Sequence, residues 1–585
     1  MIEKTKNLLS FFKSNSFRTT VAVIILIQLL VAFQGFDVCD DGFVMTFYQQ
    51  FFNAPESVSY NFLYYSSGIL GGLWYELYPN GGIFWFRILG IIINTACFIT
   101  AYKILKSHIP KGYLFCGLTI VLFINNFGFL SFYHNHLTAL LCLIIIFLLK
   151  KGFETHQLNF FFLAGILIGV NSLVRLPNFA FWSILLVIIF DYFINKKRYK
   201  QLLSYLSFSI LGIITGLGLL LMFMLVFDHL EIMKQSLSIL FDLGNTEGSA
   251  HNFKDVIMAQ YYNYIEITLA TISVIIFIII FFKIFDVSRN SRFTHFISIL
   301  VSIVAVIFWI YQFEIYAVYA LGIMACLSII LLKKNGEILR LIGFMGMVTM
   351  FIIPLGTGGG VKNAGYIAIW IGLPLFFLFL NNFSEILNSF LKIKLNFKSH
   401  SQFTIYTIFI VAFLLYKSFR IFNEAYFDKG SRLNKTEAIN NKLARYIYTT
   451  KERADVINPI LNSLKKYTKE GDHLLVYDHL PMLHFLTKTK PYTQNPWPKI
   501  YDYKNFELKL KQAEENISEK PVVVQQKFYA IHEFSEPVDD YLSEERPESI
   551  HYSIEATKVM NDFLERHQYE IVWQNEYFNI YKSNL

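Results

Sequence analysis

FDVCDDGF, residues 36–43, follows directly on an apolar run at residues 21–33 near the start of the chain. Three carboxylates, Asp37, Asp40 and Asp41, therefore stand at the mouth of a segment that is apolar enough to enter a membrane. Charge in such a place is costly unless it has a partner or a task. The plainest interpretation is three solvated loop aspartates, and the rest of the chain bears on whether they do more.

The whole chain has the composition of a membrane protein. Of its 585 residues, 54% are hydrophobic and only 16% are charged, against about 25% charged in a soluble protein. Apolar runs recur at 17–36, 81–104, 112–131, 136–150, 158–173, 179–195, 202–227, 264–284, 294–311, 314–333, 338–354, 364–381 and 403–420. They predict a polytopic α-helical membrane protein with about 13 transmembrane helices.

Lys and Arg residues gather in alternate loops, as the positive-inside rule expects of cytoplasmic loops. The basic loops hold Lys4, Lys6, Lys13 and Arg18; Lys106 and Lys111; Lys150 and Lys151; Lys196, Lys197, Arg198 and Lys200; Lys283, Arg289 and Arg292; Lys333, Lys334 and Arg340; and Lys392, Lys394 and Lys398. This pattern accounts for the net charge of +8 without nucleic acid. We expect a bacterial cytoplasmic membrane protein with its N-terminus inside. The acidic loop at 37–80, the loop at 228–263 and all residues after Tyr416 are then outside.

Two further features belong to the exported side. No small-residue cleavage site follows the first apolar run, so we expect a retained span and not a signal peptide. Of the five cysteines, only Cys39 lies outside an apolar segment, which leaves no disulfide framework in the exported part.

The composition turns polar near residue 421, and we divide the chain into a transmembrane domain at 1–420 and a C-terminal extracytoplasmic domain at 421–585. Residues 434–467 read as helical with an interruption at Pro459, and residues 554–566 as a second helix. Strands are expected at 473–477 and 521–524, with a short helix at 481–486, and a terminal hairpin at 569–573 and 577–581. Strands that alternate with helices predict a small α/β domain.

The acidic pair is the first candidate for chemistry. At a helix start, Asp40 and Asp41 point about 100° apart, which suits two different tasks. One carboxylate can accept a proton from a hydroxyl, and the other can position it, bind a sugar hydroxyl or hold a metal. The structural alternative is N-capping of the helix expected at 43–52, a position that aspartate favours.

Other outer loops also carry polar side chains. His134 and His136 stand two residues apart, where both can face one site as ligands of a divalent metal or as phosphate donors; the alternative is a pair of interfacial histidines. Glu231 belongs to an acidic loop and is a candidate for substrate binding. An enzyme that works on the outer face would have such loops, whereas a transporter would be expected to place polar groups near mid-membrane, often in broken helices.

Three cations are candidates for phosphate binding. Arg87 lies a turn or two inside the second span, where a cation usually has a partner, although its side chain can also snorkel to the interface. Arg175 and Lys362 are the lone cations of otherwise neutral outer loops. Arg binds phosphate as a fork and Lys as a point charge, and a plain loop charge is the alternative for each. The glycine-rich run at 356–360, beside Lys362, can offer backbone N–H groups to an anion or form a turn.

The first hundred residues resemble the GT-C superfamily of polyprenyl-phosphate-dependent glycosyltransferases, which includes protein O-mannosyltransferases and aminoarabinose transferases. The resemblance lies in the acidic pair after the first span, an aromatic helix (Phe43, Phe47, Tyr48), the apolar surface segment 61–81, and Arg87-Ile88-Leu89 early in the second span. Many spans followed by an extracytoplasmic domain also fit. Many members have Asp-Glu where this chain has Asp-Asp. Because Asp-Asp also occurs in related arabinofuranosyl-type enzymes, the subfamily stays open.

The resemblance implies a polyprenyl-phosphate-linked sugar as donor and catalysis by a carboxylate of the first outer loop, a role that carries to Asp40. The acceptor would be a lipid, a glycan or a protein at the membrane, and no nucleic acid is implied. No cofactor is required, with a divalent metal at the histidines as the alternative. Three other functions remain: an oligosaccharide transferase or polymerase that uses a diphosphate-linked glycan, a lipid or glycan transporter, and a non-catalytic scaffold.

Overall fold

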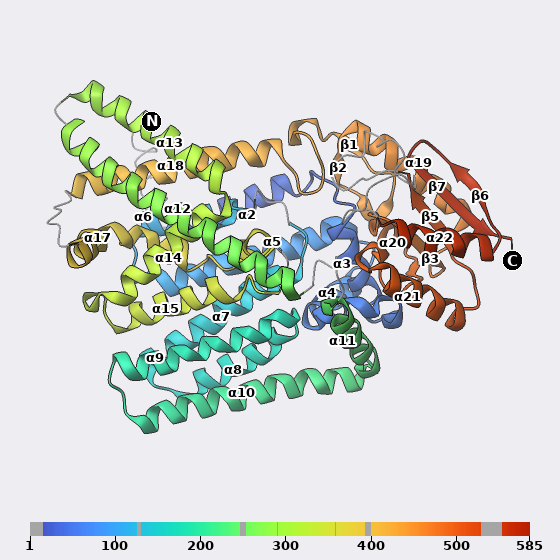
Figure 1. The fold of residues 1–585 in the computed structure, drawn as a ribbon, viewed down its shortest axis with the longest axis horizontal. Helices are drawn as coiled ribbons and strands as arrows, with labels where there is room; N and C mark the ends of the chain where they lie inside the picture. The colour runs from blue at the N-terminus through green and yellow to red at the C-terminus, as the bar shows by residue number, and fades with distance from the viewer. Residues whose placement is uncertain are drawn as a thin grey trace, which may run out of the picture.

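The computed structural model describes residues 16–125, 130–245, 253–288, 291–356, 359–391, 399–527 and 553–584. Figure 1 shows an elongated molecule in which a bundle of long helices occupies one end and a smaller domain with a β-sheet occupies the other. Helices account for nearly all of the first part, and the strands are confined to the second. This order agrees with the polytopic helical protein and C-terminal α/β region that the sequence predicts.

Each of the predicted spans coincides with a helix. The bundle contains α2 (Ser16–Val31), α5 (Gly82–Leu105), α6 (Lys111–Phe123), α7 (His134–Thr155), α8 (Leu158–Ser172), η2 (Leu176–Leu185) continued by α9 (Leu186–Ile194), α10 (Tyr199–Val226), α12 (Phe253–Ser288), α13 (Arg292–Phe313), α14 (Ile315–Leu331), α15 (Glu337–Ile352), α16 (Val361–Ala364) with η4 (Gly365–Ile367), α17 (Gly372–Leu391) and α18 (Ser399–Asn423). Within the described ranges, seven helices are long and apolar enough to cross a membrane, or eight if a pair bent by 78° at residues 368–371 is one span. The predicted number of thirteen crossings therefore stays a prediction.

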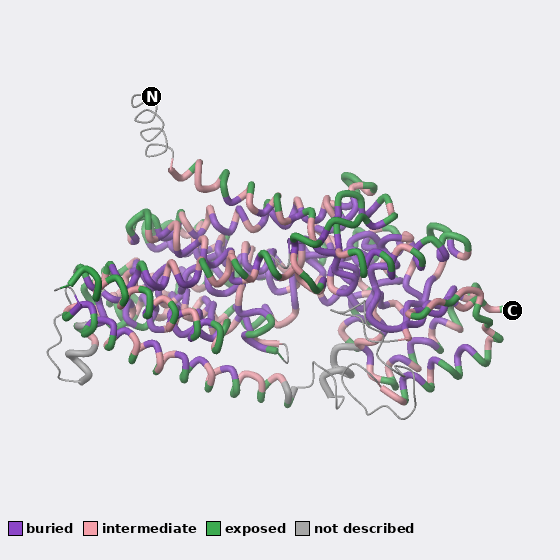
Figure 2. The backbone as a smooth tube through the Cα atoms, turned by 90° about the horizontal axis from the view of Figure 1, so that it is seen from above, coloured by how far each residue is buried: buried purple, intermediate pink, exposed green. Residues whose placement is uncertain are grey.

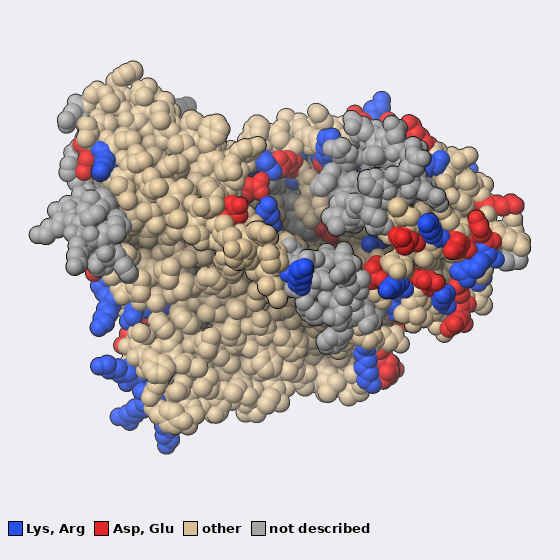
Figure 3. All heavy atoms as spheres, in the orientation of Figure 1, with Lys and Arg blue, Asp and Glu red and all other residues tan. Residues whose placement is uncertain are grey.

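The bundle helices pack closely where small residues face one another. Gly165 of α8 and Gly212 of α10 lie back to back, and a Cβ built on Gly165 would come within 2.1 Å of the Ser209 carbonyl oxygen. Contacts of this kind let two backbones approach without a hydrophobic driving force, as in membrane interiors. Figure 3 shows the middle of the bundle almost free of charged atoms on the visible face, while Lys and Arg gather at the end away from the C-terminal domain.

The acidic loop leads into a compact helical layer at the other end of the bundle. It consists of α3 (Asp40–Gln50), η1 (Pro55–Tyr64) and α4 (Tyr65–Leu77). Gly68 and Gly71 of α4 lie directly against the rings of Phe47 and Tyr48 of α3, because a Cβ on either glycine would come within 2.5 Å of those rings. The apolar surface segment that the sequence indicates at residues 61–81 is thus largely helical and packed on α3, and α11 (Leu230–Asn245) completes this layer.

The C-terminal domain is built on a five-stranded sheet of order β4-β3-β5-β7-β6. Strand β3 (His473–Tyr477) runs parallel to β4 (Lys490–Pro491) and to the central strand β5 (Val522–Gln526). The terminal hairpin of β6 (Tyr569–Gln574) and β7 (Phe578–Ser583) adds to the sheet through β7, which pairs antiparallel to β5. Helices α19 (Lys451–Tyr467), α20 (Met482–Thr487), α21 (Tyr503–Asn516) and α22 (Ile554–Arg566) accompany the sheet. The sequence predicted β3, β5, α20, α22 and the hairpin, and it missed α21 and β4.

One predicted element of this domain is wrong in its first half. Residues 434–450 form no α-helix. The segment begins at the end of the short 3₁₀ helix η5 (Arg432–Asn434) and contains a second one, η6 (Lys442–Ala444), and the antiparallel strands β1 (Glu437–Ala438) and β2 (Tyr448–Thr449). The reason is a tertiary partner: the Tyr448 N–H donates to the Phe33 carbonyl at 2.8 Å, and the Gly35 N–H donates to the Tyr448 carbonyl at 2.9 Å. Helix α19 itself continues through Pro459.

This pairing joins the residues that follow α2 to the C-terminal domain. The residues between α2 and α3 lie against the C-terminal domain, and in Figure 2 buried residues run in a continuous band from the bundle into that domain. Helix α20 packs on α3 so closely that a Cβ on Gly42 would lie 2.1 Å from the Met482 nitrogen. The acidic loop is therefore enclosed between the membrane helices and the C-terminal domain.

Candidate functional site

The three aspartates of the acidic loop have three different surroundings. Asp37 caps α3: its carboxylate accepts the N–H of Cys39 at 2.7 Å and the N–H of Asp41 at 2.8 Å. Burial and the neighbouring carboxylates of Asp41 and Asp40 raise the pKa of Asp37 well above its ordinary value. Helix capping, which the sequence offered as the alternative for Asp40 and Asp41, is therefore a role of Asp37.

Asp41 is buried and held from two sides. Its Oδ2 accepts a hydrogen bond from the Ser131 hydroxyl at 2.9 Å and lies 3.8 Å from the Arg87 guanidinium. Burial raises the pKa of Asp41, while Arg87 and the Ser131 hydrogen bond lower it. Arg87 also donates to the carbonyls that follow α2, to Ala32 at 2.6 Å and to Gly35 at 2.6 Å. The Asp41–Arg87 pair thus ties the acidic loop to the second predicted span.

Asp40 is the one carboxylate of the three that is partly exposed. Its Oδ2 accepts a hydrogen bond of 2.6 Å from the Tyr426 hydroxyl, which comes from the segment after α18. Burial raises the pKa of Asp40 to about 6, the Tyr426 hydrogen bond lowers it, and the Asp41 charge raises it. A carboxylate with a pKa near 6 is mostly ionised at pH 7 and still basic enough to take a proton.

Further tyrosines surround Asp40. Burial, and then the Asp40 carboxylate, raise the pKa of the Tyr133 hydroxyl. Burial also raises the pKa of Tyr64, which Arg175 lowers and Asp40 raises, so the Tyr64 hydroxyl lies within range of both charges. The Tyr366 hydroxyl likewise interacts with both Asp40 and Arg175. Tyr64 and Tyr366 are therefore described side chains on which both the Asp40 carboxylate and the Arg175 guanidinium act.

Arg175 lies on the side of these tyrosines away from Asp40, and its side chain is buried. Its guanidinium donates to the Asn135 side chain at 3.1 Å and to the carbonyls of Ile353 at 3.0 Å and Leu355 at 2.9 Å. Asn135 in turn donates to the Tyr366 hydroxyl at 3.2 Å. Arginine has five N–H donors, and within the described part of the chain these three bonds are the ones that Arg175 makes. Two of its N–H donors therefore have no partner among the described residues.

The two histidines do not act as a pair. The His134 ring stacks on Tyr64 with centroids 4.2 Å apart and 6° between planes, and its buried Nδ1 has no hydrogen-bond partner among the described residues. The Nδ1 of His136 accepts the Tyr133 N–H at 3.1 Å, which caps the start of α7. Within the described ranges, no group of three or more His, Cys, Asp or Glu side chains is arranged to hold a metal ion. His134 thus lines the tyrosine ring, and His136 shapes the loop that carries it.

Two other predicted residues lie apart from Asp40. Glu231 is exposed on the first turn of α11 and pairs with Lys234. Lys362 is exposed on α16, with its Nζ 5.7 Å from the centre of the Tyr316 ring. No contact joins either residue to Asp40 in the described part of the chain. Lys362 stands four residues before Tyr366, so its segment contributes to the group of tyrosines near Asp40 although the Lys362 side chain does not.

No role for the tyrosines that surround Asp40, or for Ser131, follows from the sequence patterns. Tyr64 and Tyr133 lay inside motifs that had been singled out, but aromatic residues near a membrane surface are common and carry no signal of their own. Tyr426 lies 386 residues from Asp40, and no local pattern links two such positions. Figure 3 shows a hollow between the bundle and the C-terminal domain, with acidic and basic side chains around its rim.

The chain matches no family model, and no curated protein matches its sequence. Among solved structures it is similar to the oligosaccharyltransferase of Archaeoglobus fulgidus tethered to an acceptor peptide, at 12% identity and a TM-score of 0.45 over 88% of this chain and 70% of the other. It is also similar to AglB of Archaeoglobus fulgidus in complex with an inhibitory peptide and a dolichol-phosphate, at 12% identity and a TM-score of 0.44 over 88% and 70% of the two chains.

A third similar structure is ArnT of Cupriavidus metallidurans bound to undecaprenyl phosphate, at 11% identity and a TM-score of 0.45, with 97% of this chain and 98% of the other covered. Because every TM-score is below 0.5, we take the function from the side chains of this protein and not from these likenesses.

Proposed function

We propose that this protein is a membrane glycosyltransferase that moves a sugar from a polyprenyl-phosphate donor to a hydroxyl of a lipid, glycan or protein acceptor on the outer face of the cytoplasmic membrane. The observation that carries the proposal is the setting of Asp40. It is partly exposed, its pKa is near 6, and its Oδ2 is bonded to Tyr426. Its neighbours Asp37 and Asp41 are buried and occupied by other partners.

The reaction is a single displacement at the anomeric carbon. The acceptor oxygen forms a bond to that carbon as its proton passes to Asp40, and the bond from the carbon to the phosphate oxygen breaks. The electron pair leaves with the lipid phosphate, so the phosphate gains negative charge. Attack from the side opposite the leaving group inverts the configuration of the sugar.

We assign to Arg175 the stabilisation of the negative charge that develops on the lipid phosphate. Two of its N–H donors are left after its bonds to Asn135 and two carbonyls, and a cation fixed in advance by such bonds stabilises developing charge without reorganisation. His134 and the rings of Tyr64 and Tyr133 would flank the sugar. Arg87 acts through Asp41, because its guanidinium is already bound to that carboxylate and to backbone carbonyls. Lys362 would meet the phosphate at the entrance, and Glu231 would act on an acceptor beyond the site.

One observation favours a second function. The helix pair Val361–Ile367 and Gly372–Leu380 is bent by 78°, and broken helices near a polar site are typical of transporters. A lipid or glycan transporter would move the donor between membrane leaflets without breaking a bond. The tyrosine ring and the basic carboxylate have no evident task in such a protein, so we rank it second.

The two functions separate in reconstituted vesicles. Purified protein would be supplied with a panel of radiolabelled undecaprenyl-phosphate-linked sugars and an extract of bacterial membrane lipids and glycans. We expect release of free undecaprenyl phosphate with the label on an acceptor. We also expect Asp40→Asn to abolish this release, while Asp455→Asn, an exposed carboxylate of α19, leaves it unchanged. Movement of intact donor across the vesicle with no cleavage would instead support the transporter.

A further inference from the structure

The segment that carries the acidic loop is bonded to the C-terminal part of the chain along its whole length. Phe33 and Gly35 pair with Tyr448, as described above. Further along, the Val38 carbonyl accepts the Met482 N–H at 3.1 Å, and the Cys39 thiol donates to the His479 carbonyl at 3.1 Å. The C-terminal domain therefore holds the backbone on both sides of Asp37.

Tyr426 extends this hold to a side chain. It lies just after α18, in a tight turn where Ala425 bridges to Asp428 and Phe427 has a positive φ of 47°. From this turn its hydroxyl reaches Asp40 Oδ2 at 2.6 Å. A carboxylate with one oxygen bound in this way has its plane fixed and keeps the other oxygen for a proton.

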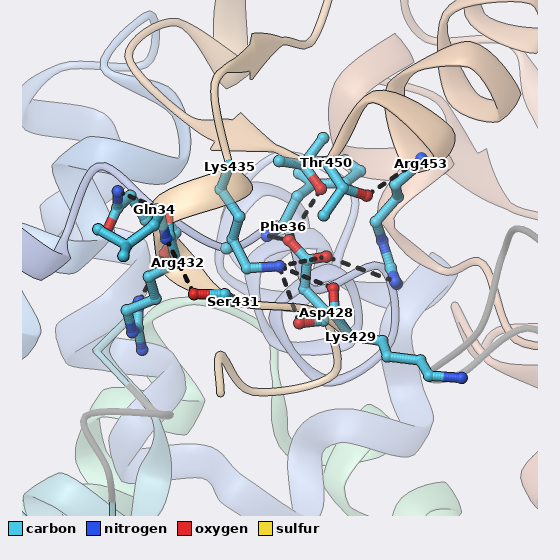
Figure 4. Close-up of polar contacts among 12 residues, drawn as sticks. Gln34, Phe36, Asp428, Lys429, Ser431, Arg432, Lys435, Thr450 and Arg453 are labelled. Carbon is cyan, nitrogen blue, oxygen red and sulfur yellow. Dashed lines mark hydrogen bonds and ion pairs between the residues drawn. The ribbon is translucent and has the colours of Figure 1, made fainter. Parts of the chain in front are cut away.

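Asp428 fixes the turn from which Tyr426 projects. Its Oδ2 accepts the Phe36 N–H at 2.7 Å and the Thr449 hydroxyl at 2.8 Å, and its Oδ1 lies 2.9 Å from the Lys435 ammonium and 3.9 Å from Arg453. Figure 4 shows Lys435 and Arg453 directed at Asp428 from opposite sides. Asp428 and Lys435 are both fully buried. The Asp428 carboxylate thus joins the start of the acidic loop, at Phe36, to Lys435, Thr449 and Arg453 of the C-terminal domain.

We propose that Tyr426 is a positioning residue for Asp40, and that the cluster around Asp428 holds Tyr426 in place, so that the C-terminal domain controls the orientation and protonation of the catalytic carboxylate. This inference rests on the role proposed for Asp40 above. It gives the C-terminal domain a direct part in the reaction and does not depend on which acceptor is used.

Proton transfer at Asp40 provides the readout, because a hydrogen bond to an ionised carboxylate favours the ionised form. The titratable groups that act on Asp40, or on which Asp40 acts, are Asp37, Cys39 and Asp41 on its own segment, Tyr64 in η1, Tyr133 before α7, Tyr366 in η4 and Tyr426 after α18. Tyr426 is the one among them that lowers the pKa of Asp40 by a hydrogen bond.

The test is the pH dependence of kcat/KM for sugar transfer by the full-length protein. A base must be ionised to act, so the rate falls on the acid side of its pKa. Tyr426→Phe keeps the ring and removes the hydroxyl, so we expect the acid limb to move to higher pH by about 1 unit. Thr449→Val removes one hydrogen bond from Asp428 and keeps the shape, and we expect a smaller shift in the same direction.

Tyr467→Phe is the matched control, because Tyr467 also donates a partly buried hydrogen bond in the C-terminal domain, to the Val572 carbonyl at 3.0 Å, away from Asp40. It should leave the acid limb in place. An unmoved limb in Tyr426→Phe, or an equal shift in Tyr467→Phe, would overturn the positioning role. An unmoved limb in Thr449→Val would overturn the anchoring by Asp428. Normal transfer by Asp40→Asn would instead remove the role of Asp40 as the base, whatever Tyr426→Phe does, and absence of transfer by the wild-type protein would remove the proposed function.

Discussion

Asp428 and Asp40 lie at the same junction between the membrane helices and the C-terminal domain, yet the fold treats their carboxylates in opposite ways. Asp428 is fully buried and has an ammonium, a guanidinium, a hydroxyl and a backbone N–H around it. Asp40 is partly exposed and has one hydrogen bond within the described part of the chain, from an uncharged tyrosine. Full compensation makes a charge structural, whereas incomplete compensation leaves a charge that can still bind a proton.

The largest expected effect is on stability, at Asp428. Asp428→Asn leaves the Lys435 ammonium buried without its carboxylate, and the loss of one partner of a buried pair costs about 3–5 kcal/mol. We expect a marked fall in the thermal unfolding midpoint in detergent. The double variant Asp428→Asn, Lys435→Met removes both charges and should recover much of that loss. Equal instability of the single and double variants would show that the pair is not what holds the junction together.

The next effect concerns the contact between α3 and α20. A Cβ on Gly42 would lie 2.1 Å from the Met482 nitrogen and 2.4 Å from its Cα, so Gly42→Ala must push the two helices apart. Overpacking of this kind costs about 1–3 kcal/mol, and we expect transfer to fall along with the unfolding midpoint. Gly112→Ala is the control, since a Cβ there meets nothing within 4 Å. A Gly42→Ala variant as active and stable as Gly112→Ala would argue against tight docking.

The smallest effect lies on the Asp40 side, and its sign follows from the raised pKa. Burial raises the pKa of Asp40 from 3.8 to about 6, so the folded protein favours the protonated carboxyl. This contribution to stability is present at pH 4 and is lost as the pH rises through about 6. We therefore expect Asp40→Asn to be as stable as the wild type at pH 4 and more stable at pH 8. Lower stability of the variant at pH 8 would mean that Asp40 is compensated like Asp428.

The sequence predicted the helical elements well and their tertiary relations poorly. Apolar runs of the right length located every bundle helix, since a segment in lipid must hydrogen-bond its backbone N–H and C=O groups internally, which a helix does. Local patterns also located β3 and α22, which alternate or repeat regularly. The segment at 434–450 was misjudged because its two short strands pair with each other and Tyr448 also pairs with residues 33–35, which no local pattern contains.

The candidate site shows the same division. The acidic pair, Arg175 and the loop at 131–136 could be found, because charged or polar residues at the ends of apolar runs stand out. The sequence also favoured the pair Asp40 and Asp41 over Asp37, and the structure shows that Asp40 is the partly exposed carboxylate of the three. Tyr426 and Asp428 were out of reach, since their roles depend on contacts across almost four hundred residues of chain.

The most direct test of Asp40 as the base is sugar transfer by Asp40→Asn under single-turnover conditions at saturating undecaprenyl-phosphate-linked donor. Asparagine keeps the size and the hydrogen bond with Tyr426 but cannot accept the proton. The proposal predicts that the variant binds donor as the wild type does and transfers sugar about 10²–10⁴-fold more slowly. Transfer at the wild-type rate, with donor fully bound, would contradict it.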